Sequence, residues 1–218
     1  DEGDGKDARN TGARIPPRPE GRGFLRDDSM SVQKAGTRIS YTVTHLEMES
    51  RPDYDWPRLP PTSSTAALLK SEDPPVWWFL TLYDAVGRNY AWEDIHAWEH
   101  ERIDEWLSAD RMSLYTLFEH GWPQGFFMLE DKGKGVCDLA YFGIVPESVG
   151  KGLGSWLLQT AVLTAWNRKG VTKLTVNTCT LDHPRALALY QRHGFTPARR
   201  ERRTRRLTRD RDLSRIPS

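Results

Sequence analysis

The chain has 218 residues, which is enough for one well-buried domain with extensions and short for two. Its 31 basic and 30 acidic residues leave a formal net charge of +1, so no overall attraction to nucleic acid or to an anionic membrane is expected. The 2 cysteines give no sign of a disulfide framework, and no apolar run approaches the ~20 residues that span a bilayer. These features predict a cytoplasmic protein without a membrane partner.

The N-terminal segment 1–36 is rich in Gly, Arg, Asp and Pro and shows almost no apolar periodicity. Such a segment buries too little surface to order itself, so we expect it to be disordered or extended. Order should begin near Thr37, because Arg38 to Thr44 alternates β-branched with polar residues, as a strand does. The prolines between Pro52 and Pro61 then predict a loop.

A helical pattern starts at Pro75, where apolar residues recur at three- and four-residue spacing. It predicts one helix that ends at Gly87 and a second from about Trp92 to Ala109. Several of the 9 tryptophans fall in this stretch. We expect most of these rings to fill a helical core layer. The alternative is that some of them form the wall of a substrate pocket.

The second half of the chain alternates strand-like and helical segments around glycine-rich turns. Its first three strands should form an antiparallel meander, and the whole is an α+β arrangement around one mixed sheet. Residues 208–218 read as a polar C-terminal tail. The predicted elements are strands Ser113–Glu119, Gln124–Glu130 and Val136–Val145, a helix Gly152–Asn167, a strand Val171–Cys179, a helix Pro184–His193, and a strand from near Phe195.

A glycine-rich loop lies between a predicted strand and an amphipathic helix, with glycines at 150, 152 and 154. Free amides at the start of that helix, together with the helix dipole, favour an anion, and a diphosphate is the natural ligand. Lys151 adds a positive charge. The loop lacks the Gly-Lys-Ser/Thr ending of a P-loop, and it does not open a βαβ unit as a Rossmann loop does.

A second motif follows the next predicted strand: Thr180-Leu-Asp-His-Pro-Arg-Ala-Leu-Ala-Leu-Tyr-Gln-Arg-His-Gly-Phe. With both motifs, the chain resembles the GNAT (GCN5-related N-acetyltransferase) superfamily, bacterial type. Members carry a Gln/Arg-x-x-Gly-x-Gly/Ala loop for the CoA pyrophosphate and then a helix ending in Leu-Tyr-x-x-x-Gly-Phe. The resemblance covers roughly residues 113–203. It implies a splayed central sheet flanked by helices over residues 37–207, and acetyl transfer from acetyl-CoA to a primary amine in a ternary complex. The tryptophan-rich helices favour a small-molecule amine. His96, His100 and His120 lack the spacing of a complete metal site, so no metal is expected.

The resemblance also implies roles for particular residues. Tyr190 matches the family's usual general acid, which protonates the departing thiolate, and a buried core tyrosine is the alternative. Asp138 lies where some members place a catalytic glutamate, and would act as a base through a water. A solvated strand carboxylate is the alternative there, and Glu130 is the reserve candidate. The implied cofactor contacts are Phe142, Gly143, Ile144, Val145, Val149, Gly150, Lys151, Gly152, Leu153, Gly154, Ser155, His183 and Ala186.

The sequence departs from the family pattern in two places. Val149 stands where Gln or Arg is usual, so one side-chain contact to phosphate is missing. His183 stands where many members have Asn, although histidine still donates a hydrogen bond. Neither Cys137 nor Cys179 has a His/Asp partner pattern that would make it a nucleophile.

Other functions stay open at this point. The chain could be a catalytically weak module that only binds acyl-CoA, or it could acetylate a protein or peptide instead of a small molecule. The arginines from Arg199 to Arg211 could contact nucleic acid. They begin in a predicted strand and lack interleaved aromatic residues, so we expect a solvated strand edge. A homodimer is compatible with the sequence.

Overall fold

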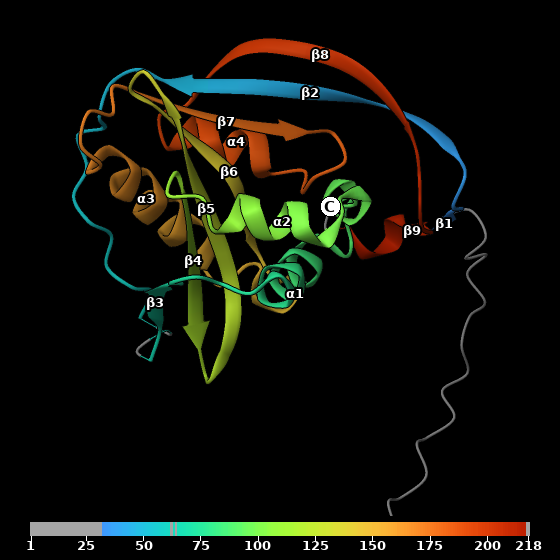
Figure 1. Ribbon diagram of the computed structural model, residues 1–218, viewed down its shortest axis with the longest axis horizontal. Helices are drawn as coiled ribbons and strands as arrows, with labels where there is room; N and C mark the ends of the chain where they lie inside the picture. Colours follow the sequence, from blue (N-terminus) through green and yellow to red (C-terminus); the bar gives the residue numbers. More distant parts are fainter. Residues whose placement is uncertain (1–31, 62, 64, 217–218) are drawn as a thin grey trace, which may run out of the picture.

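The computed structural model describes residues 32–61, 63 and 65–216, so the disorder expected for residues 1–31 lies outside the described residues. In sheet order, its strands are β3 (Ala67–Lys70), β4 (Met112–Glu119), β5 (Trp122–Gly133), β6 (Val136–Ile144), β7 (Lys173–Cys179), β2 (Arg38–Met48) and β8 (Thr196–Arg206). These seven strands form one mixed sheet (Figure 1). Neighbouring strands are antiparallel except β6 and β7, and the predicted meander β4–β5–β6 is confirmed.

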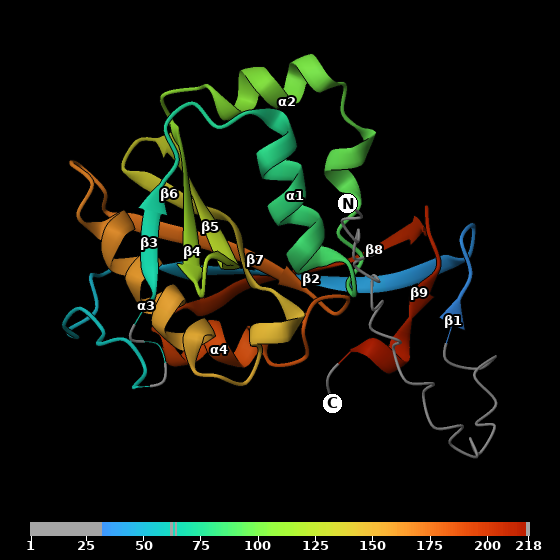
Figure 2. The same cartoon turned by 90° about the horizontal axis from the view of Figure 1, so that it is seen from below.

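Helices cover both faces of this sheet (Figure 2). On one face lie α1 (Val76–Gly87) and α2 (His100–Leu107), and α1 buries Phe79 and Leu82 completely. The opposite face carries α3 (Leu153–Trp166) and α4 (Ala186–Arg192), where the apolar side of α3 is fully buried. The predicted α+β class, a mixed sheet flanked by helices, is therefore confirmed.

The sheet opens between its two halves. β6 and β7 pair only over the segments 136–138 and 173–175, and beyond this point the two strands separate. Figure 1 shows β4, β5 and β6 running in one direction and β7, β2 and β8 crossing them in another. Among the described strands, none pairs with Leu139–Ile144 or Val176–Cys179 across the gap. The expected splay is present, and it leaves room between the strands.

Strand β2 occupies the interior of the second half, with β7 on one side and β8 on the other. The predicted strand at Arg38–Thr44 is confirmed and continues to Met48, because Leu46 and Met48 are buried against the core of α3. β8 forms the outer edge, and most of its arginines are exposed. Charged side chains on an edge strand discourage pairing with other chains.

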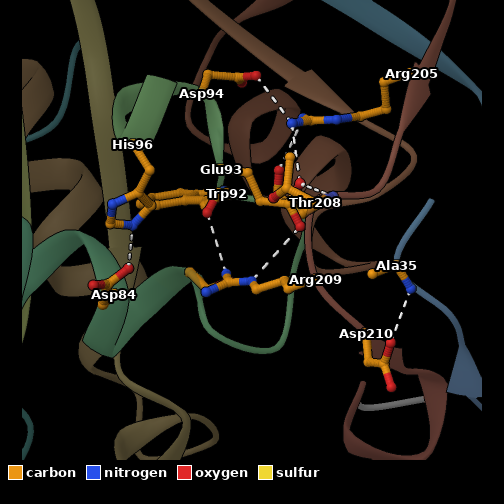
Figure 3. Close-up of polar contacts among 12 residues, drawn as sticks. Ala35, Asp84, Trp92, Glu93, Asp94, His96, Arg205, Thr208, Arg209 and Asp210 are labelled. Carbon is orange, nitrogen blue, oxygen red and sulfur yellow. Dashed lines mark hydrogen bonds and ion pairs between the residues drawn. The ribbon is translucent and has the colours of Figure 1, made fainter. Parts of the chain in front are cut away.

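The predicted helix from Trp92 to Ala109 is wrong in its first half. Residues 94–97 form a short 3₁₀ turn, Trp98 is extended, and α2 begins only at His100. The cause lies far away in the sequence. Glu93 is 3% exposed and accepts hydrogen bonds from Arg205 and from the backbone N–H of Thr208 (Figure 3). Local periodicity cannot show such a contact.

The C-terminal residues take part in the fold. Strand β9 (Arg211–Asp212) pairs with β1 (Val32–Gln33), so residues expected to be an extended N-terminus and a polar tail are joined. Arg209 donates to the backbone carbonyl of Trp92 at 3.2 Å (Figure 3). It also donates to the backbone carbonyl of Gly87 at 3.3 Å. The C-terminal segment thereby holds the loop that follows α1. Strands β1 and β9 both lie outside the residues 37–207 to which the acetyltransferase resemblance was assigned.

Candidate active site

A cavity of about 540 Å³ lies where β6 and β7 separate. Its middle is formed by Leu139–Ile144 of β6 and by the end of β7. One end is formed by the loop after β6 and by α4, and the other by β2, β8 and the loop after α1. The cavity therefore passes through the sheet from one face to the other. Its volume is in the range of small-molecule and cofactor sites.

The glycine-rich loop has the backbone that its sequence predicts. Gly150 and Gly152 have φ values of +88° and +82°, which side-chain-bearing residues rarely adopt. The 14-residue helix α3 begins directly after them, and no side chain caps its first turn. Among the described residues, none accepts a hydrogen bond from the N–H groups of 150–155. These amides, at the positive end of the helix dipole, fit a phosphate group.

The predicted loop residues divide into two groups. Val149, Gly150, Gly152, Gly154 and Ser155 line the cavity, and the Ser155 hydroxyl lies 2.8 Å from Nε2 of His193. Lys151 is exposed and outside the lining, so the structure does not bring its side chain to the cavity. Leu153 is fully buried in the core beneath α3, which leaves only its backbone available.

Strand β6 brings Phe142, Gly143 and Ile144 to the cavity, as predicted. Val145 is not in the lining, because its side chain packs into the core beneath α1. Position 143 holds a glycine for a steric reason. A Cβ on this residue would lie 2.2 Å from Cγ1 of Val86, so a side chain here would push α1 away from the strand.

Tyr190 lies on α4 and lines the cavity although only 5% of it is exposed. Its ring packs edge-to-face against Phe142 and Phe195. Burial raises the pKa of its phenol well above the usual range, with smaller contributions from the charges of Asp182 and Asp138. The phenol is therefore neutral at pH 7 and able to donate a hydrogen bond into the cavity. It is also a weaker acid than a free phenol.

His183 lines the same cavity, and one of its ring nitrogens is unsatisfied among the described residues. Its Nδ1 accepts a hydrogen bond from the N–H of Arg185 at 3.0 Å, so the proton of the neutral ring resides on Nε2. Nε2 is buried and has no partner among the described residues. Burial, together with the charge of Arg185, lowers the pKa of this imidazole. Ala186, at the start of α4, also lines the cavity beside it.

Asp138 lies outside the cavity lining, although its neighbour Leu139 belongs to it. Its carboxylate accepts a hydrogen bond from Thr175, where β6 and β7 still pair. Burial raises the pKa of this carboxyl, and the hydrogen bond from Thr175 opposes that shift. The reserve candidate Glu130 is bound by Arg111 and Lys132 and is also outside the lining.

Sequence analysis missed the far end of the cavity. It is lined by Tyr41 and His45 of β2, Asn177 of β7, and Arg203 and Arg205 of β8. The sequence shows an arginine-rich stretch. It does not show that these residues form a strand beside β2, on which alternate side chains line the cavity. Among the tryptophans of the described residues, Trp92 alone lines the cavity, next to Tyr83, Tyr90 and Tyr141, so an aromatic wall with a tryptophan rests on this ring.

Comparison with known proteins places this geometry in a family. The sequence matches the Acetyltransferase (GNAT) family over residues 77–195, more than half of the chain. The mycothiol acetyltransferase of Jonesia denitrificans is 32% identical over 99 residues, which are 44% of this chain and 31% of that protein. This chain therefore belongs to the GNAT family of acetyltransferases, whose members use acetyl-CoA as co-substrate.

Solved structures agree on the fold. A GCN5-related N-acetyltransferase from Sphaerobacter thermophilus has a TM-score of 0.57 at 13% identity, over 83% of this chain and 54% of that one. A tandem GNAT protein from the clavulanic acid biosynthesis pathway has a TM-score of 0.55 at 15% identity, over 82% and 56%. The chain spans less than two thirds of the length of each of these relatives.

Two further findings concern the described residues only. They contain no group of three or more His, Cys, Asp and Glu residues that could hold a metal ion. Of the helices within residues 32–216, none has the length and apolar character needed to cross a membrane.

Proposed function

We propose that this chain transfers the acetyl group of acetyl-CoA to a primary amine of a small molecule, by direct attack in a ternary complex. The observation that carries the proposal is the single cavity through the splayed sheet. The glycine-rich loop of residues 150–154 lies at one of its ends and a polar pocket at the other. Two substrates entering from opposite faces would meet beside β6, where Tyr190 lies.

On the cofactor side, the free amides of residues 150–155 would bind the diphosphate. The pantetheine arm of acetyl-CoA would then run along Phe142–Ile144. Among the described strands, none pairs with the backbone of these residues on the side of the gap. His183 would donate from Nε2 to an acceptor on the pantetheine arm, which satisfies a donor that is otherwise buried without a partner. Ala186 leaves space next to it.

The reaction requires the amine nitrogen to lose two protons and the departing sulfur to gain one. An alkyl ammonium of pKa ~10.4 must lose a proton, which costs about 4.6 kcal/mol at pH 7. We propose that Asp138 receives it through water, because its raised pKa makes it a stronger base than an ordinary aspartate. The amine nitrogen then bonds to the thioester carbon, the carbon–sulfur bond breaks, and the nitrogen releases its second proton to water. Tyr190 donates its hydrogen bond, and then its proton, to the departing sulfur, and is reprotonated from solvent.

The boundaries proposed for the acetyltransferase domain are based on the fold. We propose that residues 32–216 form one acetyltransferase domain, since β1 and β9 join the expected extensions to it. Cys137 and Cys179 are free thiols, which fits a reducing compartment such as the cytoplasm.

The test is a thiol-release assay with acetyl-CoA and a panel of amines, with mass spectrometry of the products. Amino acids, polyamines, aminoglycosides and short peptides would make up the panel. We expect at least one small amine to be acetylated, with saturation in both substrates. Titration calorimetry on the same protein separates the alternatives. Micromolar binding of acetyl-CoA without any acetylated product would indicate a binding module, and exclusive acetylation of peptides would overturn the small-molecule acceptor.

A further inference from the structure

The pocket at the far end of the cavity, which we call the acceptor pocket, is formed by Tyr41, His45, Asn177, Arg203 and Arg205. These residues come from three adjacent strands of the same sheet half. Tyr41 of β2 lies directly across from Arg203 of β8, and His45 lies across from Asn177 of β7. If the chain is an acetyltransferase as proposed above, this pocket receives the amine substrate.

Arg203 is held in one orientation with part of its guanidinium unused. Its Nε and Nη2 groups donate to the two carboxylate oxygens of Glu201, each at 2.9 Å. This two-point contact fixes the plane of the guanidinium. Neither of these two contacts uses Nη1, and the Tyr41 hydroxyl lies within hydrogen-bonding reach of the guanidinium. The side chain is about half exposed, with 47% of its surface accessible, at the open end of the pocket.

The positive charge here is only partly compensated. Glu201 is shared between Arg203 and Arg199, whose Nη1 lies 3.3 Å from the same carboxylate, so two guanidinium groups face one carboxylate. Arg205 differs, because it is bound by Glu93 at 3.4 Å and Asp94 at 3.1 Å (Figure 3). The unused donors of the pocket therefore gather around Arg203.

We propose that Arg203 binds a carboxylate of the acceptor, so that the substrate is a small amine that also carries a carboxylate, such as an amino acid or a close derivative. A carboxylate suits one pre-oriented guanidinium with free N–H donors. The nearby donors, the Tyr41 hydroxyl and the Asn177 amide, are uncharged, which favours a singly charged group over a phosphate. This inference rests on the proposed function and specifies the substrate class for the same site.

The experiment compares matched pairs of amines with the wild-type chain: free amino acids against the corresponding amino-acid amides. We expect kcat/KM to be about tenfold or more higher for the free acids. In Arg203→Gln that preference should fall to about twofold or less, while the KM for acetyl-CoA stays unchanged. Arg202→Gln, an exposed arginine on the same strand outside the pocket, serves as the matched control and should keep the preference.

The outcomes separate the two claims. Equal acetylation of acids and amides by the wild-type chain would overturn the carboxylate site and leave the acetyltransferase function standing, and this comparison needs no variant to fold. A preference that survives in folded Arg203→Gln would also overturn it. Acetyl-CoA binding without acetylation of any amine would overturn the proposed function and, with it, this inference.

Discussion

Replacing Gly152 tests the phosphate-binding loop most selectively. This residue precedes α3 with φ +82°, and a Cβ built on it would have Cγ of Pro60 as its nearest neighbour, at 3.6 Å. There is thus room for a side chain, although the backbone conformation is strained for most residues. Asp and Asn tolerate this conformation better than other residues and have the same shape. Gly152→Asp and Gly152→Asn therefore differ only in a negative charge beside the free amides.

The size of the effect follows from Coulomb's law. A carboxylate at position 152 and a phosphate on the neighbouring amides would lie roughly 6 Å apart, which corresponds to a repulsion of about 2–3 kcal/mol at an effective dielectric constant of about 20. Since about 1.4 kcal/mol is a factor of ten, affinity for acetyl-CoA should fall at least tenfold, and up to about a hundredfold at low salt.

Titration calorimetry of acetyl-CoA against both variants is the assay, with circular dichroism to confirm folding. We expect Gly152→Asn to bind within about threefold of the wild-type chain. Gly152→Asp should bind at least about tenfold more weakly than Gly152→Asn, and the difference should shrink as salt is added. Equal affinities of the two folded variants would refute the placement of the diphosphate on these amides.

Three further predictions concern stability, acid–base chemistry and cofactor contact. Glu93→Gln breaks the buried ion pair with Arg205 and should lower the free energy of unfolding by about 2–3 kcal/mol, less than a full loss because Arg205 keeps Asp94 as a partner. The melting temperature should fall by roughly 5–10 °C, against about 1–2 °C or less for the exposed control Asp94→Asn. Equal shifts in the two variants would contradict this prediction. Because burial raises the pKa of Asp138, kcat/KM should fall as the pH drops through that raised pKa. In Asp138→Asn this acidic limb of the pH profile should vanish and the plateau value of kcat/KM should be lower. An unchanged pH profile would exclude Asp138 as the base. His183→Ala should raise the KM for acetyl-CoA about five- to tenfold with little change in melting temperature, whereas lost stability with normal kinetics would assign His183 to packing alone.

The parts of the site that could be predicted from sequence are those with local causes. Gly150 and Gly152 are required by backbone conformation directly before a helix, and this requirement is visible in the letters themselves. Tyr190 was placed by a motif that spans a single helix and the turn after it, and it does line the cavity. The place of residues 142–144 at the cavity could be predicted because they lie at the end of a strand that precedes the glycine-rich loop.

The parts that could not be predicted depend on contacts between distant segments. β2 lies about 150 residues from β8 in the sequence but pairs with it, and this pairing creates the acceptor pocket around Arg203. The segment before α2 does not join the helix predicted for it, and Glu93 in that segment is bound by Arg205 of β8. The resemblance pointed to Asp138, but the sequence could not show that its carboxylate accepts a hydrogen bond from Thr175 outside the cavity lining.

The central claim is that acetyl transfer occurs in this cavity beside Tyr190, and Tyr190→Phe tests it most directly. The change removes one oxygen and keeps the ring between Phe142 and Phe195, so packing should survive. The measurement is single-turnover acetyl transfer to the best amine of the panel, with acetyl-CoA affinity determined on the same preparation. We expect the rate to fall roughly 10²–10⁴-fold while the affinity changes little. A rate close to that of the wild-type chain, with chemistry rate-limiting, would contradict the account, because water or another residue would then supply the proton.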